Sequence, residues 1–136
     1  MELVNRQIVE RFVRGTLGCE CPDEVFERIS ISPVNPCPGL PVDGSLEVGG
    51  RLLIYISTEA DIRVLRENLE KMILEGKKDR DKRGFNRFRL VIATGSVKEI
   101  ESILAPLFGA LALKDDKVHL HVVRPQGIKD LMQLRS

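Results

Sequence analysis

The chain has 136 residues, a size that fits one domain with a full hydrophobic core. Its 21 Lys and Arg residues and 20 Asp and Glu residues give a net charge of +1, which excludes a globally basic nucleic-acid-binding protein. The longest run of large apolar residues, 52–56, is far shorter than a membrane-spanning helix, and Met1-Glu2-Leu3 does not begin a signal peptide. We therefore expect a cytoplasmic protein without a membrane partner.

Two helical segments are predicted in the first part of the chain. Residues 4–14 carry apolar side chains at three- and four-residue spacing, which indicates an amphipathic helix that ends at Gly15. Pro22 suits the first position of a helix, and the two acidic residues after it suit the positive end of the helix dipole. A short helix is therefore predicted over 22–28, with Cys21 as its capping residue.

A proline-rich connection follows a candidate short strand at 29–32. Residues 33–48 contain four prolines, which remove backbone donors and exclude a helix, so we expect an irregular, extended segment. Cys37 lies between two of these prolines. The connection is either a strap that crosses from the helices to the sheet or a loop shaped to hold a ligand, and we favour the strap.

From residue 51 onward, the pattern alternates between strands and helices. Strands are predicted over 51–57, 88–94 and 117–123, and such strand–helix–strand units form right-handed parallel sheets. The predicted fold is therefore α/β: a three-layer domain with a mainly parallel βαβαβ sheet and an N-terminal helical segment. We expect one domain over 1–136, in which 1–50 is the helical and proline-rich cysteine segment and 51–136 is the βαβαβ core.

The helices of this core have predicted boundaries of their own. The first begins at Thr58 and ends at Gly76, the second opens with Ser96 as its cap and contains Pro106, and a short last helix spans 128–134. Pro106 is expected to kink or shorten the second helix. The predicted core residues of the sheet and helices are Leu53, Ile54, Ile56, Leu65, Leu69, Val91, Ile92, Ile103, Leu104, Leu120 and Val122.

Residues 77–89 hold seven basic and two acidic residues. We interpret them as a mobile connection that is dispensable for folding, because charges at helix–strand junctions are usually solvated. Nucleic acid is a candidate partner of this segment, with basic side chains on phosphates and the ring of Phe85 or Phe88 stacked on a base, although Phe88 is expected to begin a buried strand. The interspersed acidic residues argue against that role.

All three cysteines, Cys19, Cys21 and Cys37, lie in the first 37 residues. Clustered cysteines in a cytoplasmic chain indicate metal or redox chemistry. We predict that the three converge in one small site and are the candidate metal ligands, with zinc or an iron–sulfur cluster as the candidate cofactor. Against this, Cys19 and Cys21 are closer than the usual zinc knuckle requires, and no fourth cysteine exists. The alternative is that they are ordinary small buried side chains.

Two further features bear on the site. His119 and His121 lie on one predicted strand and therefore on the same face, either as extra metal ligands or as a polar strand surface. Gly95 follows the strand 88–94 at a carboxyl edge, where open α/β sheets bind ligands. No catalytic constellation or phosphate-binding glycine motif is present, so catalytic and cofactor-binding residues stay unknown.

Residues 14–26 read RGTLGCECPDEVF. This stretch resembles a signature, LGCxCP followed by acidic residues and VF, of small uncharacterised prokaryotic proteins; the resemblance implies no activity. Cysteines at a helix start are also similar to those of thioredoxin-type redox proteins and iron–sulfur proteins. The spacing here departs from CxxC, and the four-cysteine ligand set is incomplete.

The sequence thus supports two main hypotheses. The first is a small cytoplasmic α/β binding or regulatory module of unknown ligand, which forms a homo-oligomer or binds a protein partner. The second is a metal- or iron–sulfur-binding or thiol redox protein that uses Cys19, Cys21 and Cys37. A small hydrolase or transferase at the carboxyl edge of the sheet ranks third, and whether the protein is an enzyme stays open.

Overall fold

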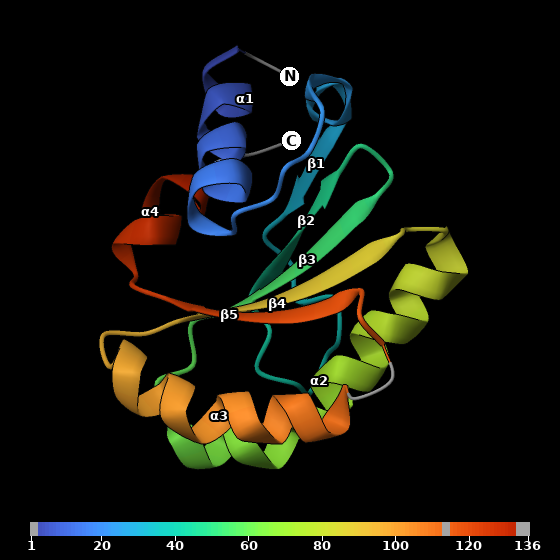
Figure 1. Cartoon of the computed structure of the whole chain (residues 1–136). Helices are drawn as coiled ribbons and strands as arrows, with labels where there is room; N and C mark the ends of the chain where they lie inside the picture. The colour runs from blue at the N-terminus through green and yellow to red at the C-terminus, as the bar shows by residue number, and fades with distance from the viewer. Residues whose placement is uncertain (1–2, 113–114, 133–136) are drawn as a thin grey trace.

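The computed structural model describes residues 3–112 and 115–132 and is built on a five-stranded sheet in the order β1-β2-β3-β4-β5 (Figure 1). The strands are β1 (Ile29–Ser32), β2 (Gly44–Val48), β3 (Leu52–Ser57), β4 (Arg87–Ala93) and β5 (Val118–Val123). The helical elements are α1 (Leu3–Glu10), the π-helical turn η1 (Arg11–Thr16), the 3-10 turn η2 (Asp23–Glu27), α2 (Ile62–Arg83), α3 (Val97–Leu111) and α4 (Gln126–Met132).

Strands β3, β4 and β5 are parallel and are connected through α2 and α3, as the sequence predicted. The prediction of a mainly parallel sheet was wrong, because β1 and β2 add two antiparallel pairings beside β3. Strand β2 lies inside the stretch predicted to be an irregular connection. Its alternating side chains bury Leu46 and Val48 in the core, and this burial compensates for the weak strand signal.

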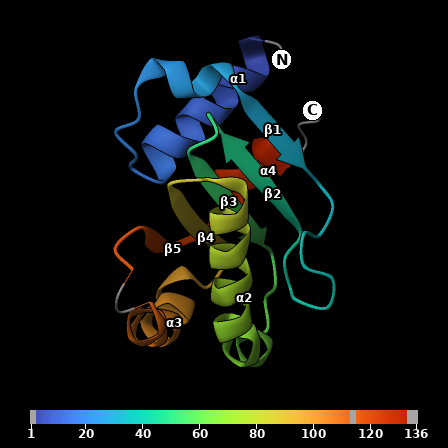
Figure 2. The same cartoon turned by 90° about the vertical axis from the view of Figure 1, so that its right-hand side faces the viewer.

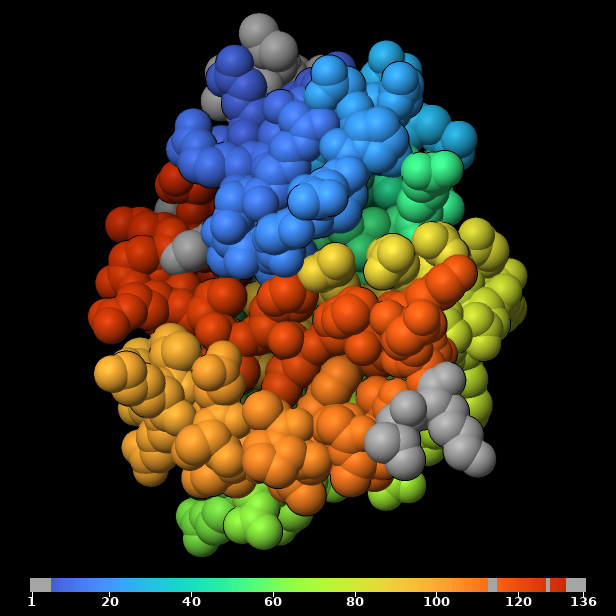
Figure 3. All heavy atoms as spheres, viewed as in Figure 1, coloured from blue at the N-terminus to red at the C-terminus, as the bar shows by residue number. Residues whose placement is uncertain are grey.

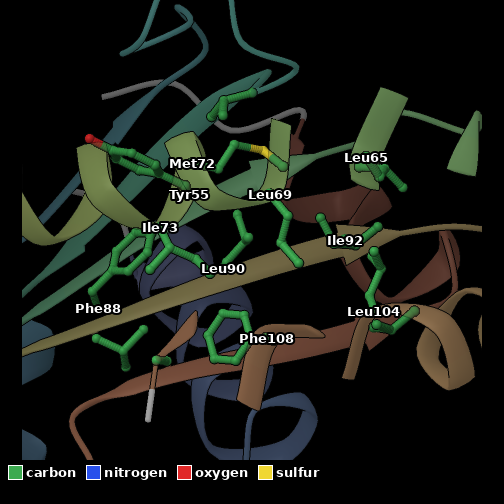
Figure 4. Close-up of a cluster of buried hydrophobic side chains, with 14 of the residues drawn as sticks. Tyr55, Leu65, Leu69, Met72, Ile73, Phe88, Leu90, Ile92, Leu104 and Phe108 are labelled. Atoms are coloured by element: carbon green, nitrogen blue, oxygen red, sulfur yellow. The ribbon is translucent and has the colours of Figure 1, made fainter. Parts of the chain in front are cut away.

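Different helices cover the two faces of the sheet: α2 and α3 lie on one side, and α1, η1 and α4 lie on the other (Figures 1 and 2). The connections from β3 to β4 and from β4 to β5 are both crossovers between parallel neighbours, and the second continues across the sheet in the same direction as the first. Because such crossovers have the same hand, their helices α2 and α3 lie on the same face. Apolar side chains of β3 and β4 pack there against α2 and α3 (Figure 4). The predicted core residues are buried, except that Ile103 and Leu120 are half-buried.

Several helix boundaries differ from the predicted ones. The N-terminal helix is present as α1 and η1, but Pro22 rather than Cys21 caps the short turn η2. Helix α2 begins after Asp61, whose carboxylate accepts a hydrogen bond from the Arg63 amide at 2.9 Å. Helix α3 begins after Ser96 as predicted and continues through Pro106. Helix α4 begins at Gln126, and residues 133–134 of the predicted last helix lie outside the described residues.

The prediction of an irregular, mobile connection over 77–89 was wrong, whereas its dispensability for folding stays a prediction. Helix α2 does not end at Gly76 but continues to Arg83, where Gly84 adopts the left-handed conformation (φ 76°) that terminates it. The side chain of Arg80 is buried and pairs with Asp115 at 2.8 Å. Charged residues with good helix propensity therefore extend the helix, and contacts to distant residues hold its end in place.

Among the helices that the structure describes, none combines the length and apolar character needed to cross a bilayer.

Gly76 offers a test of the packing between α2 and β4. A Cβ at this position would overlap the ring of Phe88, whereas a Cβ at Gly109 of α3 would have no neighbour within 4 Å. We expect Gly76→Ala to lower the free energy of unfolding by about 1–3 kcal/mol, because the core is overpacked. Gly109→Ala, the matched control, should raise it by about 0.5–1 kcal/mol through helix propensity. Urea denaturation measures both, and equal stabilisation by the two substitutions would contradict the proposed contact.

Candidate functional site

Cys19 and Cys21 form a disulfide bond in the loop between η1 and η2, with their Cα atoms 5.4 Å apart. Only Glu20 lies between them, so the covalent ring closes over a single intervening residue. Both cysteines are half-buried. They pack against the apolar cluster between the N-terminal helices and the sheet.

The backbone of this cysteine loop is held by contacts on both sides of the disulfide. The amide of Cys19 donates to the Val13 carbonyl at 3.0 Å. The guanidinium of Arg14 donates to the Cys21 carbonyl and to the Asp23 carboxylate, each at 2.7 Å, and lies 4.8 Å from the centre of the Phe26 ring. These contacts do not involve the sulfur atoms and hold the loop in addition to the disulfide.

The disulfide opens into a pocket of about 440 Å³ at the amino ends of β3 and β4. Its basic lining residues are Arg51, Arg87 and Arg89, and its one acidic lining residue among those described is Glu20. Figure 3 shows the N-terminal segment against the start of β4 and against β5. This pocket is at the opposite end of β4 from Gly95, the carboxyl edge that the sequence indicated as the place to look for a ligand.

Arg89 is the most buried charge in this pocket, with 8% of its surface exposed. Its Nη1 donates to the Leu17 carbonyl at 3.2 Å and to Nε2 of His121 at 2.7 Å, while its buried Nε has no partner. Both acceptors are uncharged. Burial and the neighbouring charge of Arg87 lower the pKa of Arg89.

The two histidines share one face of β5, as predicted, and it is the face toward the cysteine loop. Because a guanidinium only donates, Nε2 of His121 must accept and its proton lies on Nδ1. Burial and then the charge of Arg89 lower the pKa of His121 to about 4, so the ring is neutral at neutral pH. His121 is therefore linked to the Leu17 carbonyl, next to the cysteine loop, through the hydrogen bonds of Arg89.

The prediction that the three cysteines converge was wrong. Cys37 packs with Leu40 against the cluster beneath α2 and α3, on the other face of the sheet from Cys19 and Cys21. Burial raises the pKa of its thiol, and the nearby Tyr55 hydroxyl partly offsets that rise. The separation arises because β1 lies between the two parts of the chain and the connection after it folds onto the opposite face.

The predicted three-cysteine metal site has no counterpart in this geometry. Within residues 3–112 and 115–132, no group of three or more His, Cys, Asp or Glu side chains is arranged to hold a metal ion. The sulfurs of Cys19 and Cys21 are bonded to each other, and a metal requires thiolates. In the disulfide state, neither sulfur is available as a ligand for zinc or an iron–sulfur cluster.

No family model, curated protein or solved structure shows a significant match to this chain. The site is therefore assigned from its own geometry. Sequence reasoning missed Arg89, because it counted this residue as part of a solvated basic segment. The signal was the alternation from 87 to 90, which places Phe88 in one core and its two arginine neighbours on the opposite face.

The environment of His121 predicts a pH dependence of stability. Its pKa is about 4 in the folded chain and about 6.5 when unfolded, so between these values the unfolded state binds a proton that the folded state does not. The free energy of unfolding should therefore fall as the pH decreases from about 6.5 to about 4. His121→Gln, which retains an acceptor for Arg89, should lose this part of the decline in urea denaturation. An NMR titration of the His121 ring with a midpoint near 6.5 would contradict the assignment.

Proposed function

We propose that the protein is a small thiol–disulfide redox protein in which Cys19 and Cys21 alternate between a disulfide and a dithiol. One observation carries this proposal. The disulfide lines a pocket that has three basic residues, Arg51, Arg87 and Arg89, and one acidic residue among those described, Glu20. A half-buried disulfide beside a space of about 440 Å³ can be reached by a small molecule.

A purely structural role explains this disulfide less well. The stabilisation from a cross-link grows with the length of the loop that it closes, and a ring of three residues gains less than about 2 kcal/mol in the chain-entropy description. The loop is already held by the contacts of Arg14 and the Val13 carbonyl. If the protein is cytoplasmic, as its sequence predicts, a disulfide there is most often catalytic or redox-sensing.

The exchange partner of this proposal is a low-molecular-weight thiol. Its thiolate attacks one sulfur of the Cys19–Cys21 pair; the S–S bond breaks, a mixed disulfide forms, and the other cysteine leaves as a thiolate. A second thiolate then attacks the small-molecule sulfur of the mixed disulfide and releases the remaining cysteine. Two thiols are oxidised to one disulfide, two electrons enter the protein, and the protons of the two thiols go to the two cysteines.

The charges around the pocket favour the thiolate that leaves. Positive side chains lower the pKa of a nearby thiol, and Arg87 and Arg89 line the same pocket as the cysteines. Glu20 opposes them, although it is a single, exposed carboxylate. Cys37 is in the contrasting environment, because burial raises its pKa. We therefore expect the thiols of the Cys19–Cys21 pair to be the reactive ones.

Ligand binding without redox chemistry is the second candidate function. The observation in its favour is Arg89, which lines the pocket and whose buried Nε has no partner among the described residues. In that case, the disulfide would be inert in the folded protein. The two functions differ in one measurable property, the reducibility of the Cys19–Cys21 bond under native conditions.

The test equilibrates the folded protein in buffers with different ratios of reduced and oxidised dithiothreitol. After acid quenching and alkylation, mass spectrometry counts the free thiols at each cysteine. We expect Cys19 and Cys21 to gain label together in one two-electron transition, because each is the other's partner. Cys37 should react slowly at every ratio, because its thiol is half-buried and its pKa is raised.

Two variants sharpen this measurement. Cys37→Ser should leave the midpoint of the transition unchanged, since Cys37 packs on the other face of the sheet. Cys19→Ser should abolish the two-electron transition, because Cys21 then has no partner and the second thiol of dithiothreitol releases any mixed disulfide formed at Cys21. If the Cys19–Cys21 bond of the wild-type protein is reduced only after denaturant has unfolded the chain, the redox function is wrong and the binding function takes its place.

A further inference from the structure

We infer that Arg89, supported by Arg87 and Arg51, is a carboxylate-binding subsite that selects anionic thiols as the exchange partners of Cys19–Cys21. The selection of thiols rests on the proposed redox function. The binding of a carboxylate at Arg89 does not, because it follows from the guanidinium alone.

The first argument is the burial of Arg89 without a counterion. An arginine that is 8% exposed is almost always paired, since an uncompensated buried charge is costly. The two protein acceptors of Arg89, the Leu17 carbonyl and His121, are uncharged and share the same nitrogen, Nη1. The buried Nε has no partner among the described residues, and a carboxylate that reached it would supply both the missing acceptor and the missing charge.

The second argument is a contrast within the same chain. Buried Arg80, at the end of α2, pairs with Asp115, and Arg83 pairs with Glu47. In the described part of the chain, none of the three pocket arginines forms an ion pair with a carboxylate. Of the two buried arginines, Arg80 therefore has a counterion within the described chain and Arg89 does not, and a ligand could supply that charge.

The third argument is the position of the cations relative to the sulfurs. Arg87 and Arg89 lie two residues apart on one face of β4, and the charge of Arg87 lowers the pKa of Arg89. An anion between them would relieve this repulsion. Cys19 and Cys21 line the same pocket, whose volume of about 440 Å³ suits a small molecule. A ligand with a carboxylate near its thiol would reach the arginines and the disulfide together.

The experiment uses three small thiols that differ in charge: 3-mercaptopropionate, 2-mercaptoethanol and cysteamine. The rate of reduction of the oxidised protein is measured with each thiol, and the rate of each variant is divided by the wild-type rate for the same thiol. This ratio cancels the intrinsic reactivity of the thiol. Any remaining difference reports the charge of the pocket.

Arg87→Glu is the main variant, because Arg87 is exposed and its replacement leaves the fold intact. Loss of Arg87 should slow all three thiols, because it no longer lowers the pKa of the leaving cysteine. Relative to 2-mercaptoethanol, we expect the ratio to be about fivefold lower for 3-mercaptopropionate and to be higher for cysteamine. Arg89→Met should lower the ratio for 3-mercaptopropionate at least about tenfold. Arg66→Glu, an exposed position of α2 on the other face of the sheet, is the matched control and should change none of the ratios.

A second readout does not depend on the redox reaction. Addition of 3-(methylthio)propionate, which has the carboxylate but no thiol, should shift the Nε–H NMR resonance of Arg89 in a saturable way. Arg87→Glu should weaken this binding, and Arg66→Glu should not. If the carboxylate binds but the disulfide is never exchanged in the folded protein, the redox function fails and the subsite stands. If exchange occurs with equal ratios for all three thiols and the Nε–H resonance does not shift, the subsite is wrong and the redox function stands.

Discussion

One buried guanidinium connects the cysteine loop to the sheet. Arg89 projects from β4 on the face opposite to Phe88, donates to the Leu17 carbonyl two residues before Cys19, and also donates to His121 on β5. A strand places neighbouring side chains on opposite faces, so one short stretch of β4 packs the core beneath α2 and α3 and positions the N-terminal segment on the other side. The pocket between this loop and the sheet is lined by apolar residues such as Val48 and Leu52 and by the arginines of β4.

The arginines at the end of α2 and those in the cysteine pocket differ in whether a carboxylate neutralises them. At the end of α2, arginines and acidic residues neutralise one another, and the Tyr55 hydroxyl donates to Asp79 at 2.6 Å. In the cysteine pocket, the arginines remain without carboxylates among the described residues. If only stability mattered, the buried Arg89 would be paired with a carboxylate or replaced by an apolar residue, because burying an unpaired charge is unfavourable. An unpaired buried charge is instead typical of a binding site, where a ligand completes the electrostatics.

The sheet also gives the three cysteines different surroundings. Cys19 and Cys21 share a pocket with cations, which favour a thiolate when the bond opens. Cys37 lies against the opposite core, where burial raises the pKa of its thiol. The fold therefore separates the disulfide-bonded pair from the single thiol by the thickness of the sheet. Such a separation also protects the pair from scrambling with the third cysteine.

The sequence by itself determined the elements whose signals are local. Apolar runs and helical periodicity predicted β3, β4 and β5 with their connecting helices, and the two-residue period placed His119 and His121 on one face. The strand β2, the end of α2 beyond Gly76 and the unpaired state of Arg89 depend instead on residues far apart in the chain. Gly76, for example, is predicted as a stop but serves as the contact point for Phe88. Only the tertiary structure decided these features, because the free energy of burying a strand, a helix end or a charge depends on what the folded chain places against it.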